Sequence, residues 1–329
     1  MTDSLLTLTF TIGFPLALLF AYIAWRLRRL LFIAVFPTLV AVVALGLSVV
    51  ALWLTHRPLP GDEHRTLFEG VEYIRDVRPA FGDPPHAVIV YVVRVDLDAP
   101  DISLFVTPGS PIGEFEQTAR TTSDFLDRYH VQVAINGDFF HPFYERSPIN
   151  FYPDAGEGTD VHGLAISGGE TYSSGFATGA FETMYISVDN QVTFSAPDFE
   201  PFYAISGNWL LVENGQFNPP NEMIGDASGP QPRTAVALDA SGRTLMLLLI
   251  DGRQPNYSEG ATFAELADIL IEYGAYTALN LDGGGSVTLV IEGENGRPQV
   301  LNSPIHTRIP GRERPVANHL GVFAQRLGG

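Results

Sequence analysis

Three short runs of the sequence place an acidic residue and glycine directly after an apolar stretch. They are Asn136-Gly137-Asp138, Asp251-Gly252-Arg253 and Asp282-Gly283-Gly284-Gly285-Ser286. Enzymes that hydrolyse glycosidic bonds commonly use two carboxyl groups about 5–9.5 Å apart. Asp251 and Asp282 are therefore the candidate catalytic pair. Asp-Gly after a strand is also a common tight turn, because Asp bonds its own backbone and Gly accepts positive φ.

The elements around this pair form a predicted β–α–β unit. Thr244–Ile250 is a wholly apolar strand after its first residue, Thr262 and Glu265 make a capping box, and Gly274 ends the helix. The strand that follows begins at Ala278. Such a unit predicts two parallel strands whose carboxyl ends share one rim of a sheet. The two aspartates would then lie about 4.8 Å apart on adjacent strands, or about 10 Å with one strand between them.

Other polar residues are expected to bind substrate at the same rim. Arg233 or Arg253 would clamp a phosphate, since guanidinium matches its oxygens bidentately. His306 and Arg314 lie in the loop SPIHTRIPGRERP, which either folds over the rim or forms a solvated basic loop. The predicted substrate-binding residues are Asn136, Asp138, Arg233, Arg253, Asn280, Gly283, Gly284, Gly285, Ser286, His306 and Arg314. No metal ligand set and no cofactor are predicted.

Composition excludes several other chemistries. The 329 residues carry a formal net charge of −18 and no cysteine, and all 19 basic residues are arginine. Thiolate metal sites, disulfides, cysteine nucleophiles and lysine Schiff bases are thereby excluded. An acidic chain without a basic stripe is not expected to bind nucleic acid. The sequence has neither a GxSxG elbow nor an HExxH motif.

The N-terminal part, residues 1–55, predicts a transmembrane hairpin. Residues 4–54 are almost entirely apolar apart from Arg26, Arg28 and Arg29. One helix of that length would span roughly 75 Å against a hydrocarbon core of about 30 Å. Two spans, at about residues 5–25 and 30–54, fit better, with the arginines in a cytoplasmic turn. A cleaved signal peptide is the alternative.

The remaining chain reads as a linker, residues 56–66, and one extracytoplasmic α/β domain, residues 67–325. The domain is predicted to hold a mixed sheet with few helices. Val88–Leu97 is a β-branched strand, Thr121–Tyr129 a helix, and 141–161 a loop rich in Pro, Gly and Tyr. Further strands are expected at 163–167, 184–188, 192–195, 204–212, 234–239, 277–281 and 287–291.

These residues also carry a family resemblance. The chain resembles the phosphodiester glycosidase family in the blocks AINGDFF (134–140), PRTAVALDASG (232–242), LLLIDGRQPNYSEGATFAELADILIEYGAYTALNLDGGGS (247–286) and RPVANHLGVFA (314–324). The family usually has a second Gly where Asp138 stands here. The 141–161 loop looks like a subgroup feature.

The resemblance implies a membrane-anchored hydrolase that cleaves the glycosidic bond of a sugar-1-phosphodiester. Many bacterial relatives are linked to exopolysaccharide biosynthesis, so an envelope polysaccharide is the other implied partner, besides the lipid bilayer. Two alternatives stay open. One is a non-catalytic polysaccharide-binding or assembly module, and the other is a metal-dependent phosphodiesterase that uses Asp and Asn oxygens as ligands.

Overall fold

The computed structural model describes residues 2–26, 31–175, 181–219 and 229–328, and it divides into two units. The first unit comprises residues 1–60 and 254–257, and the second comprises residues 61–253 and 258–329.

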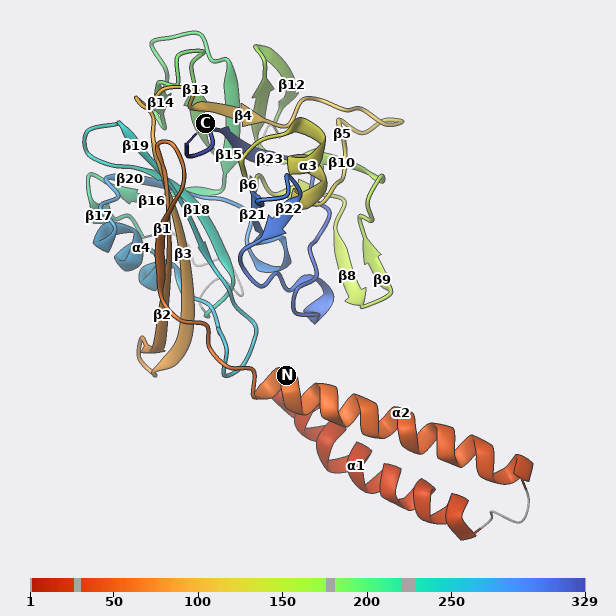
Figure 1. Ribbon diagram of the computed structural model, residues 1–329. Helices are drawn as coiled ribbons and strands as arrows, with labels where there is room; N and C mark the ends of the chain where they lie inside the picture. The colour runs from red at the N-terminus through yellow and green to blue at the C-terminus, as the bar shows by residue number, and fades with distance from the viewer. Residues whose placement is uncertain (1, 27–30, 176–180, 220–228, 329) are drawn as a thin grey trace. The chain divides into compact units, whose positions relative to one another are not determined.

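The first unit is a pair of helices, α1 (Thr2–Arg26) and α2 (Leu31–Thr55), which lie side by side in Figure 1. Small side chains are buried along the pair, among them Ala17, Ala24 and Ala41. Arg28 and Arg29, the expected turn, lie outside the described residues. Among the residues that are described, no helix has both the length and the apolar character needed to cross a membrane. The predicted hairpin of two helices is therefore observed, whereas its transmembrane character is not supported.

The second unit is rich in β-structure and is built on an eight-stranded sheet. Its strand order is β1-β2-β3-β19-β18-β20-β16-β17, and all neighbouring strands pair antiparallel. The bounds are β1 (Glu63–Phe68), β2 (Val71–Phe81), β3 (His86–Asp96), β16 (Trp209–Glu213), β17 (Gln216–Phe217), β18 (Arg233–Leu238), β19 (Thr244–Ile250) and β20 (Thr277–Asn280). Strand β1 begins inside the segment expected to be linker.

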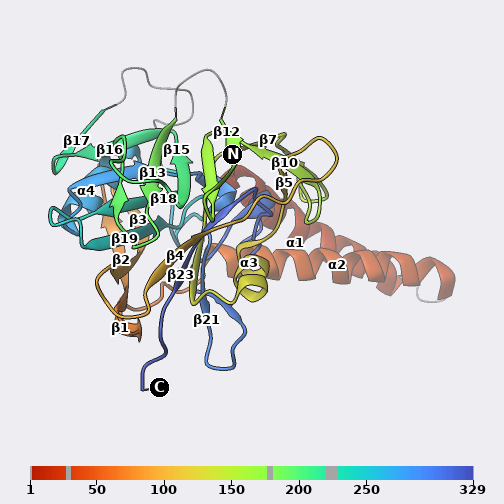
Figure 2. The ribbon, with the colours of Figure 1, turned by 90° about the horizontal axis from the view of Figure 1, so that it is seen from above.

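The predicted β–α–β unit is present, with one strand inserted. Both β19 and β20 run antiparallel to β18, which lies between them, so β19 and β20 point the same way. The connecting helix α4 (Phe263–Glu272) begins at a full capping box of Thr262 and Glu265. Helix α4 lies against the sheet (Figures 1 and 2). Its apolar side chains belong to a core that includes Leu266, Ile269 and Met246. The carboxyl ends of β19 and β20 therefore reach the same edge of the sheet.

Two five-stranded sheets complete the main framework. One has the order β22-β21-β6-β23-β4 and carries helix α3 (Thr122–Tyr129), whose Phe125 and Leu126 pack against Val131, Ala134 and Val290. The other has the order β12-β11-β15-β13-β14. The bounds are β4 (Ser103–Val106), β6 (Val133–Asn136), β11 (Leu164–Ser167), β12 (Glu170–Ser174), β13 (Glu182–Ile186), β14 (Val192–Thr193), β15 (Tyr203–Gly207), β21 (Leu289–Glu292), β22 (Pro298–Val300) and β23 (His319–Phe323).

The structure corrects two expectations. The run 204–212 is not one strand, because it breaks at Asn208 into β15 and β16, which belong to different sheets. The 141–161 segment is not a plain loop, because it contains the hairpin of β8 (Tyr144–Ser147) and β9 (Asn150–Tyr152). It also contributes to the small sheet β5-β10-β7, formed by β5 (Gln117–Thr118), β10 (Gly158–Val161) and β7 (Phe140–His141). Pairing of short polar strands leaves little apolar periodicity to read in the sequence.

Candidate active site

A cavity of about 430 Å³ lies where β18 begins and where β19 and β20 end. That volume is within the range of small-molecule sites. The described residues that line it include three arginines, two acids and three aromatic rings. These are Arg233, Arg253, Arg314, Asp282, Glu145, Phe139, Phe143 and Phe263. Positive charge at the site thus exceeds negative charge, which favours an anionic ligand.

Of the two predicted catalytic aspartates, Asp282 is the one that lines the cavity. It follows β20, is partly buried, and accepts a hydrogen bond at Oδ2 from the Ser286 hydroxyl over 2.6 Å. Burial raises the pKa of Asp282, although the Arg314 charge and the Ser286 hydrogen bond lower it in part. Its backbone is fixed as well, because the Asn136 side-chain amide donates to the Asp282 carbonyl over 2.7 Å. The site therefore holds a fixed carboxyl group that faces a cavity.

The glycines after Asp282 make room for two guanidinium groups. A Cβ on Gly284 would lie 3.0 Å from Arg253 Nη2, and Gly284 also has φ of +62°. A Cβ on Gly285 would lie 2.5 Å from Arg314 Nη2. The backbone N–H groups of Gly284 and Ser286 donate to the carbonyls of Pro232 and Gly283. Both amides are engaged, and the turn serves mainly to let the arginines approach.

Arg253 is the cavity arginine whose donors are most available. Its Nε donates to Gln231 Oε1 over 2.7 Å, and its two terminal nitrogens have no hydrogen-bond acceptor among the described residues. Burial lowers the pKa of Arg253 to about 10, helped by the charges of Arg308 and Arg314, so the group stays charged at neutral pH. Two adjacent free N–H groups match two oxygens of a phosphoryl group.

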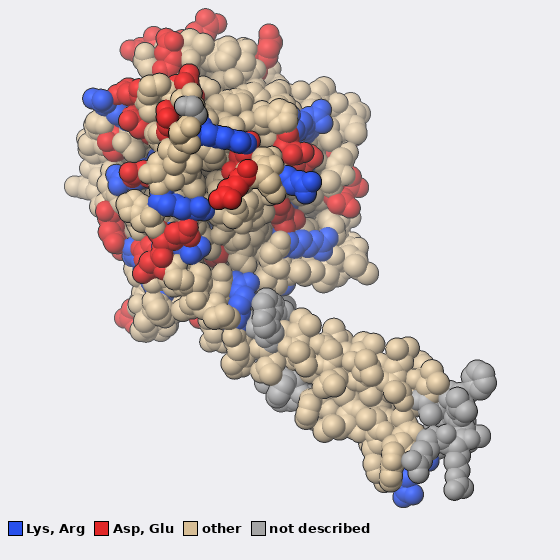
Figure 3. All heavy atoms as spheres, viewed as in Figure 1, with Lys and Arg blue, Asp and Glu red and all other residues tan. Residues whose placement is uncertain are grey.

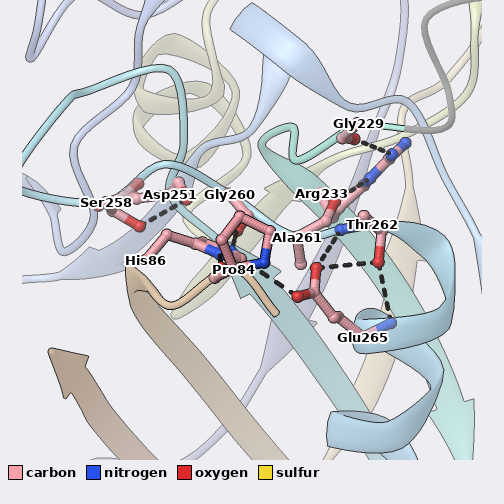
Figure 4. A network of polar contacts seen from close by, with 10 residues as sticks. All are labelled: Pro84, His86, Gly229, Arg233, Asp251, Ser258, Gly260, Ala261, Thr262 and Glu265. Carbon is pink, nitrogen blue, oxygen red and sulfur yellow. Dashed lines mark hydrogen bonds and ion pairs between the residues drawn. The ribbon is translucent and has the colours of Figure 1, made fainter. Parts of the chain in front are cut away.

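Arg233 lines the cavity beside the first turn of α4 (Figure 4). Its Nε donates to the Ala261 carbonyl over 3.0 Å, and its guanidinium carbon lies 3.8 Å from the centre of the Phe263 ring. Burial and the neighbouring Arg253 lower the pKa of Arg233 to about 10. Arg233 is thus a charged group held rigidly by an aromatic face and a carbonyl.

Arg314 is engaged with protein groups on three sides. It donates to Ser286 Oγ over 3.1 Å and to His306 Nδ1 over 3.3 Å, and it forms an ion pair with Glu145. Burial would raise the pKa of Glu145, but His306 and Arg314 outweigh that effect and hold the pKa at about 2. His306 itself is buried behind Arg314, and burial lowers its pKa. The loop that carries both residues therefore folds over the rim, as one of the two sequence interpretations proposed.

Asp251 occupies a different environment from Asp282. It is 1 % exposed and does not line the cavity. Its carboxylate accepts hydrogen bonds from the Tyr91 hydroxyl, the Asn302 side chain and the Ser303 backbone, all between 2.9 and 3.0 Å. Ser258 also donates to its carbonyl (Figure 4). Asp251, the predicted catalytic partner of Asp282, thus connects β19 to β3 and to residues 302–303 through hydrogen bonds.

Of three further predicted residues, Asn280 lines the cavity, whereas Asn136 and Asp138 do not. Asn136 is buried and accepts hydrogen bonds from Thr234 and Thr288, so it fixes Asp282 without facing the cavity. Asp138 is 1 % exposed and accepts from the Ser206 N–H over 2.7 Å, and burial raises its pKa well above the ordinary value. Asn280 lines the cavity and donates to Asn208 Oδ1 over 2.7 Å.

Comparison with known proteins identifies the chain at the level of family. A family model described as phosphodiester glycosidase matches residues 129–323, which is more than half of the chain. The chain belongs to the phosphodiester glycosidase family. A curated relative of this family, N-acetylglucosamine-1-phosphodiester alpha-N-acetylglucosaminidase from Bos taurus, is 26% identical over 209 residues. The match covers 56% of this chain and 36% of the bovine protein, so the chain spans about a third of that relative's length.

Solved structures share the phosphodiester glycosidase fold. The catalytic domain of zebrafish N-acetylglucosamine-1-phosphodiester alpha-N-acetylglucosaminidase, auto-inhibited by its pro-peptide, aligns with a TM-score of 0.57 at 20% identity, over 81% of this chain and 89% of that one. A hypothetical protein from Synechocystis aligns with a TM-score of 0.53 at 18% identity, over 81% and 64% of the two chains. At this identity the likeness concerns the fold.

In this member of the phosphodiester glycosidase family, several residues of the site carry no signal in the sequence. Glu145 lies on a hairpin that reads as a loop, and Asn302 and Ser303 lie far along the chain from Asp251. Gln231 and Asn208 support Arg253 and Asn280 through single side-chain contacts. Such partners are fixed by tertiary packing, and periodicity or motif spacing does not reveal them.

Proposed function

We propose that this chain hydrolyses the glycosidic bond of a sugar-1-phosphodiester. The observation that carries the proposal is the arrangement of Asp282 in a cavity with Arg253, whose terminal nitrogens have no described acceptor. Membership of the phosphodiester glycosidase family supports the same activity. The bovine relative is named for an N-acetylglucosamine-1-phosphodiester, which makes this sugar the first to assay.

The chemistry asks two things of the protein. A phosphate monoester is a weakly basic leaving group, so it departs from the sugar carbon with little need for a proton. The enzyme must hold the phosphoryl oxygens and stabilise the positive charge that develops on the sugar. Arg253 would hold the oxygens bidentately, with Arg233 beside it, and the Asp282 carboxylate would face the sugar.

Within this proposal Asp282 works without Asp251. Both oxygens of Asp251 are engaged by protein donors, and Asp251 has no place on the cavity wall. Asn280 and Asn208, which line the cavity, would meet sugar hydroxyl groups. The second acid on the wall, Glu145, is already paired with Arg314.

Product identification tests the proposal. The full chain is incubated with N-acetylglucosamine-1-phosphodiesters, and products are identified by mass spectrometry. A free sugar and a phosphomonoester are the expected products. A sugar phosphate and an alcohol would instead indicate a phosphodiesterase, and sensitivity to chelators would then point to the metal-dependent alternative. Saturable polysaccharide binding without turnover would indicate a binding module in envelope glycan assembly.

We also propose that α1 and α2 anchor the chain in the bacterial cell membrane, with the larger unit outside the cytoplasm. The support is the row of apolar side chains that are largely exposed on these helices, including Leu18, Trp25, Phe36 and Val42, each at least 58 % exposed. In Figure 3 charged atoms are sparse on the visible face of the helices and frequent on the larger unit. Membrane fractionation followed by carbonate washing tests this, and release of the full chain by carbonate would contradict it.

A further inference from the structure

A chain of four side chains connects the β8–β9 hairpin to Asp282. Glu145 pairs through Oε2 with Arg314 Nη2, and Arg314 Nη1 donates to Ser286 Oγ over 3.1 Å. Ser286 in turn donates to Asp282 Oδ2 over 2.6 Å. Each side chain holds the next one in place through these contacts, and the series ends at the Asp282 carboxylate.

The hairpin that supplies Glu145 is held against the 303–314 loop. Arg312 donates to the Pro148 carbonyl over 2.8 Å, and its guanidinium lies 4.7 Å from the centre of the Phe151 ring. The Phe151 ring meets His306 edge-on, with centroids 4.7 Å apart. Arg314 itself lies 4.4 Å from the centre of the Phe143 ring. These contacts hold the hairpin, and with it Glu145, beside Arg314.

Arg314 and Arg253 consequently differ in their tasks. The charge of Arg314 is matched by Glu145, which is 16% exposed at its side chain, and two further Arg314 donors are engaged. No acidic partner within ion-pair distance is described for Arg253, and only its Nε donates to a described residue. Arg253 can meet a phosphoryl group without breaking a protein contact, whereas Arg314 cannot.

We propose that Glu145 is a positioning residue, which orients the Asp282 carboxylate through Arg314 and Ser286. This inference rests on the proposed function, because it assigns Asp282 to the reaction. Glu145 itself does not need to touch the substrate. The β8–β9 hairpin that carries Glu145 would then be the part of the fold that sets the orientation of the Asp282 carboxylate.

The charged groups around Glu145 and Asp282 determine the expected pH effects. Asp282 is influenced by Arg314, Arg253 and the buried Asp138, and Glu145 by Arg314 and His306. Removing the Glu145 charge leaves Arg314 unmatched, which favours the ionised form of Asp282. Removing the Ser286 hydroxyl takes away a hydrogen bond to that ionised form, which disfavours it.

Two variants of the full chain, Glu145→Gln and Ser286→Ala, test the inference. Each should lower kcat by about 10- to 100-fold with little change in KM, because a misplaced catalytic group mainly slows the reaction step. The acid limb of the kcat profile should move to lower pH in Glu145→Gln and to higher pH in Ser286→Ala. Glu170→Gln, at an exposed strand position, is the matched control and should behave as wild type.

Opposite shifts of the acid limb are the decisive result, since a general loss of folding would not produce them. The inference is overturned if Glu145→Gln keeps the wild-type kcat and acid limb, or if the acid limb moves in the same direction in both variants. If Ser286→Ala does not fold, Glu145→Gln still decides the question through its own kcat and limb. A wild-type chain without phosphodiester turnover would instead count against the proposed function.

Discussion

The ends of β19 and β20 present the same sequence feature in two different structural roles. Asp251 and Asp282 each follow an apolar strand, each precede glycine, and reach the same edge of the sheet. Asp251 is enclosed by donors from Tyr91, Asn302 and Ser303, whereas Asp282 borders a cavity and keeps one protein donor on Oδ2. Position at a strand end therefore does not determine whether a carboxylate faces a cavity or is buried in a structural role. The segments that fold over the strand end determine this.

Replacing Asp251 tests the structural side of this comparison. Asp251→Asn removes one acceptor oxygen and sets an amide against buried donors, which should cost about 2–4 kcal/mol of unfolding free energy. For a domain of this size the midpoint of thermal unfolding should fall by about 5–10 °C. Turnover per folded molecule should remain near wild type. Asp127→Asn, at an exposed position of α3, is the control, and an equal midpoint in the two variants would contradict the assignment.

The Arg253→Gln variant tests whether the cavity beside Asp282 binds the phosphoryl group of the substrate. The variant loses the two terminal donors, so KM for a phosphodiester should rise by about 10- to 100-fold. KM for the same sugar with a neutral leaving group should change little, because no phosphoryl oxygen is present. Arg243→Gln, whose side chain is 69% exposed, provides the matched control. A similar loss with both substrates would show that Arg253 does not read the phosphate.

The pH dependence of turnover gives the smallest of these effects. Burial raises the pKa of Asp282, so the ionised carboxylate is lost as pH falls through a value above that of an ordinary aspartate. The acid limb of kcat should lie correspondingly higher. Measurement of kcat across the acidic range checks this, and a limb at or below the ordinary value of about 3.9 would contradict it.

The strands and arginines at the rim of the site could be predicted from the sequence, but the segments that fold over the rim could not. The capping box at Thr262, the apolar strand after Thr244 and the acid–glycine runs were enough to predict the rim and its arginines. They left open whether a strand lies between β19 and β20, where the structure places β18, since pairing partners depend on the whole sheet. The Glu145 hairpin and the Asn302–Ser303 segment were also missed, because single polar contacts between distant residues leave no periodic pattern.

The Asp282→Asn variant of the full chain provides the most direct test of the account. We expect kcat for a sugar-1-phosphodiester to fall by about 10³- to 10⁴-fold, as for loss of an essential catalytic group. Thermal stability should be unchanged or higher, since a raised carboxyl pKa means that the ionised form opposes folding at neutral pH. A variant that keeps wild-type turnover, or that loses turnover only by unfolding, would contradict the role given to Asp282.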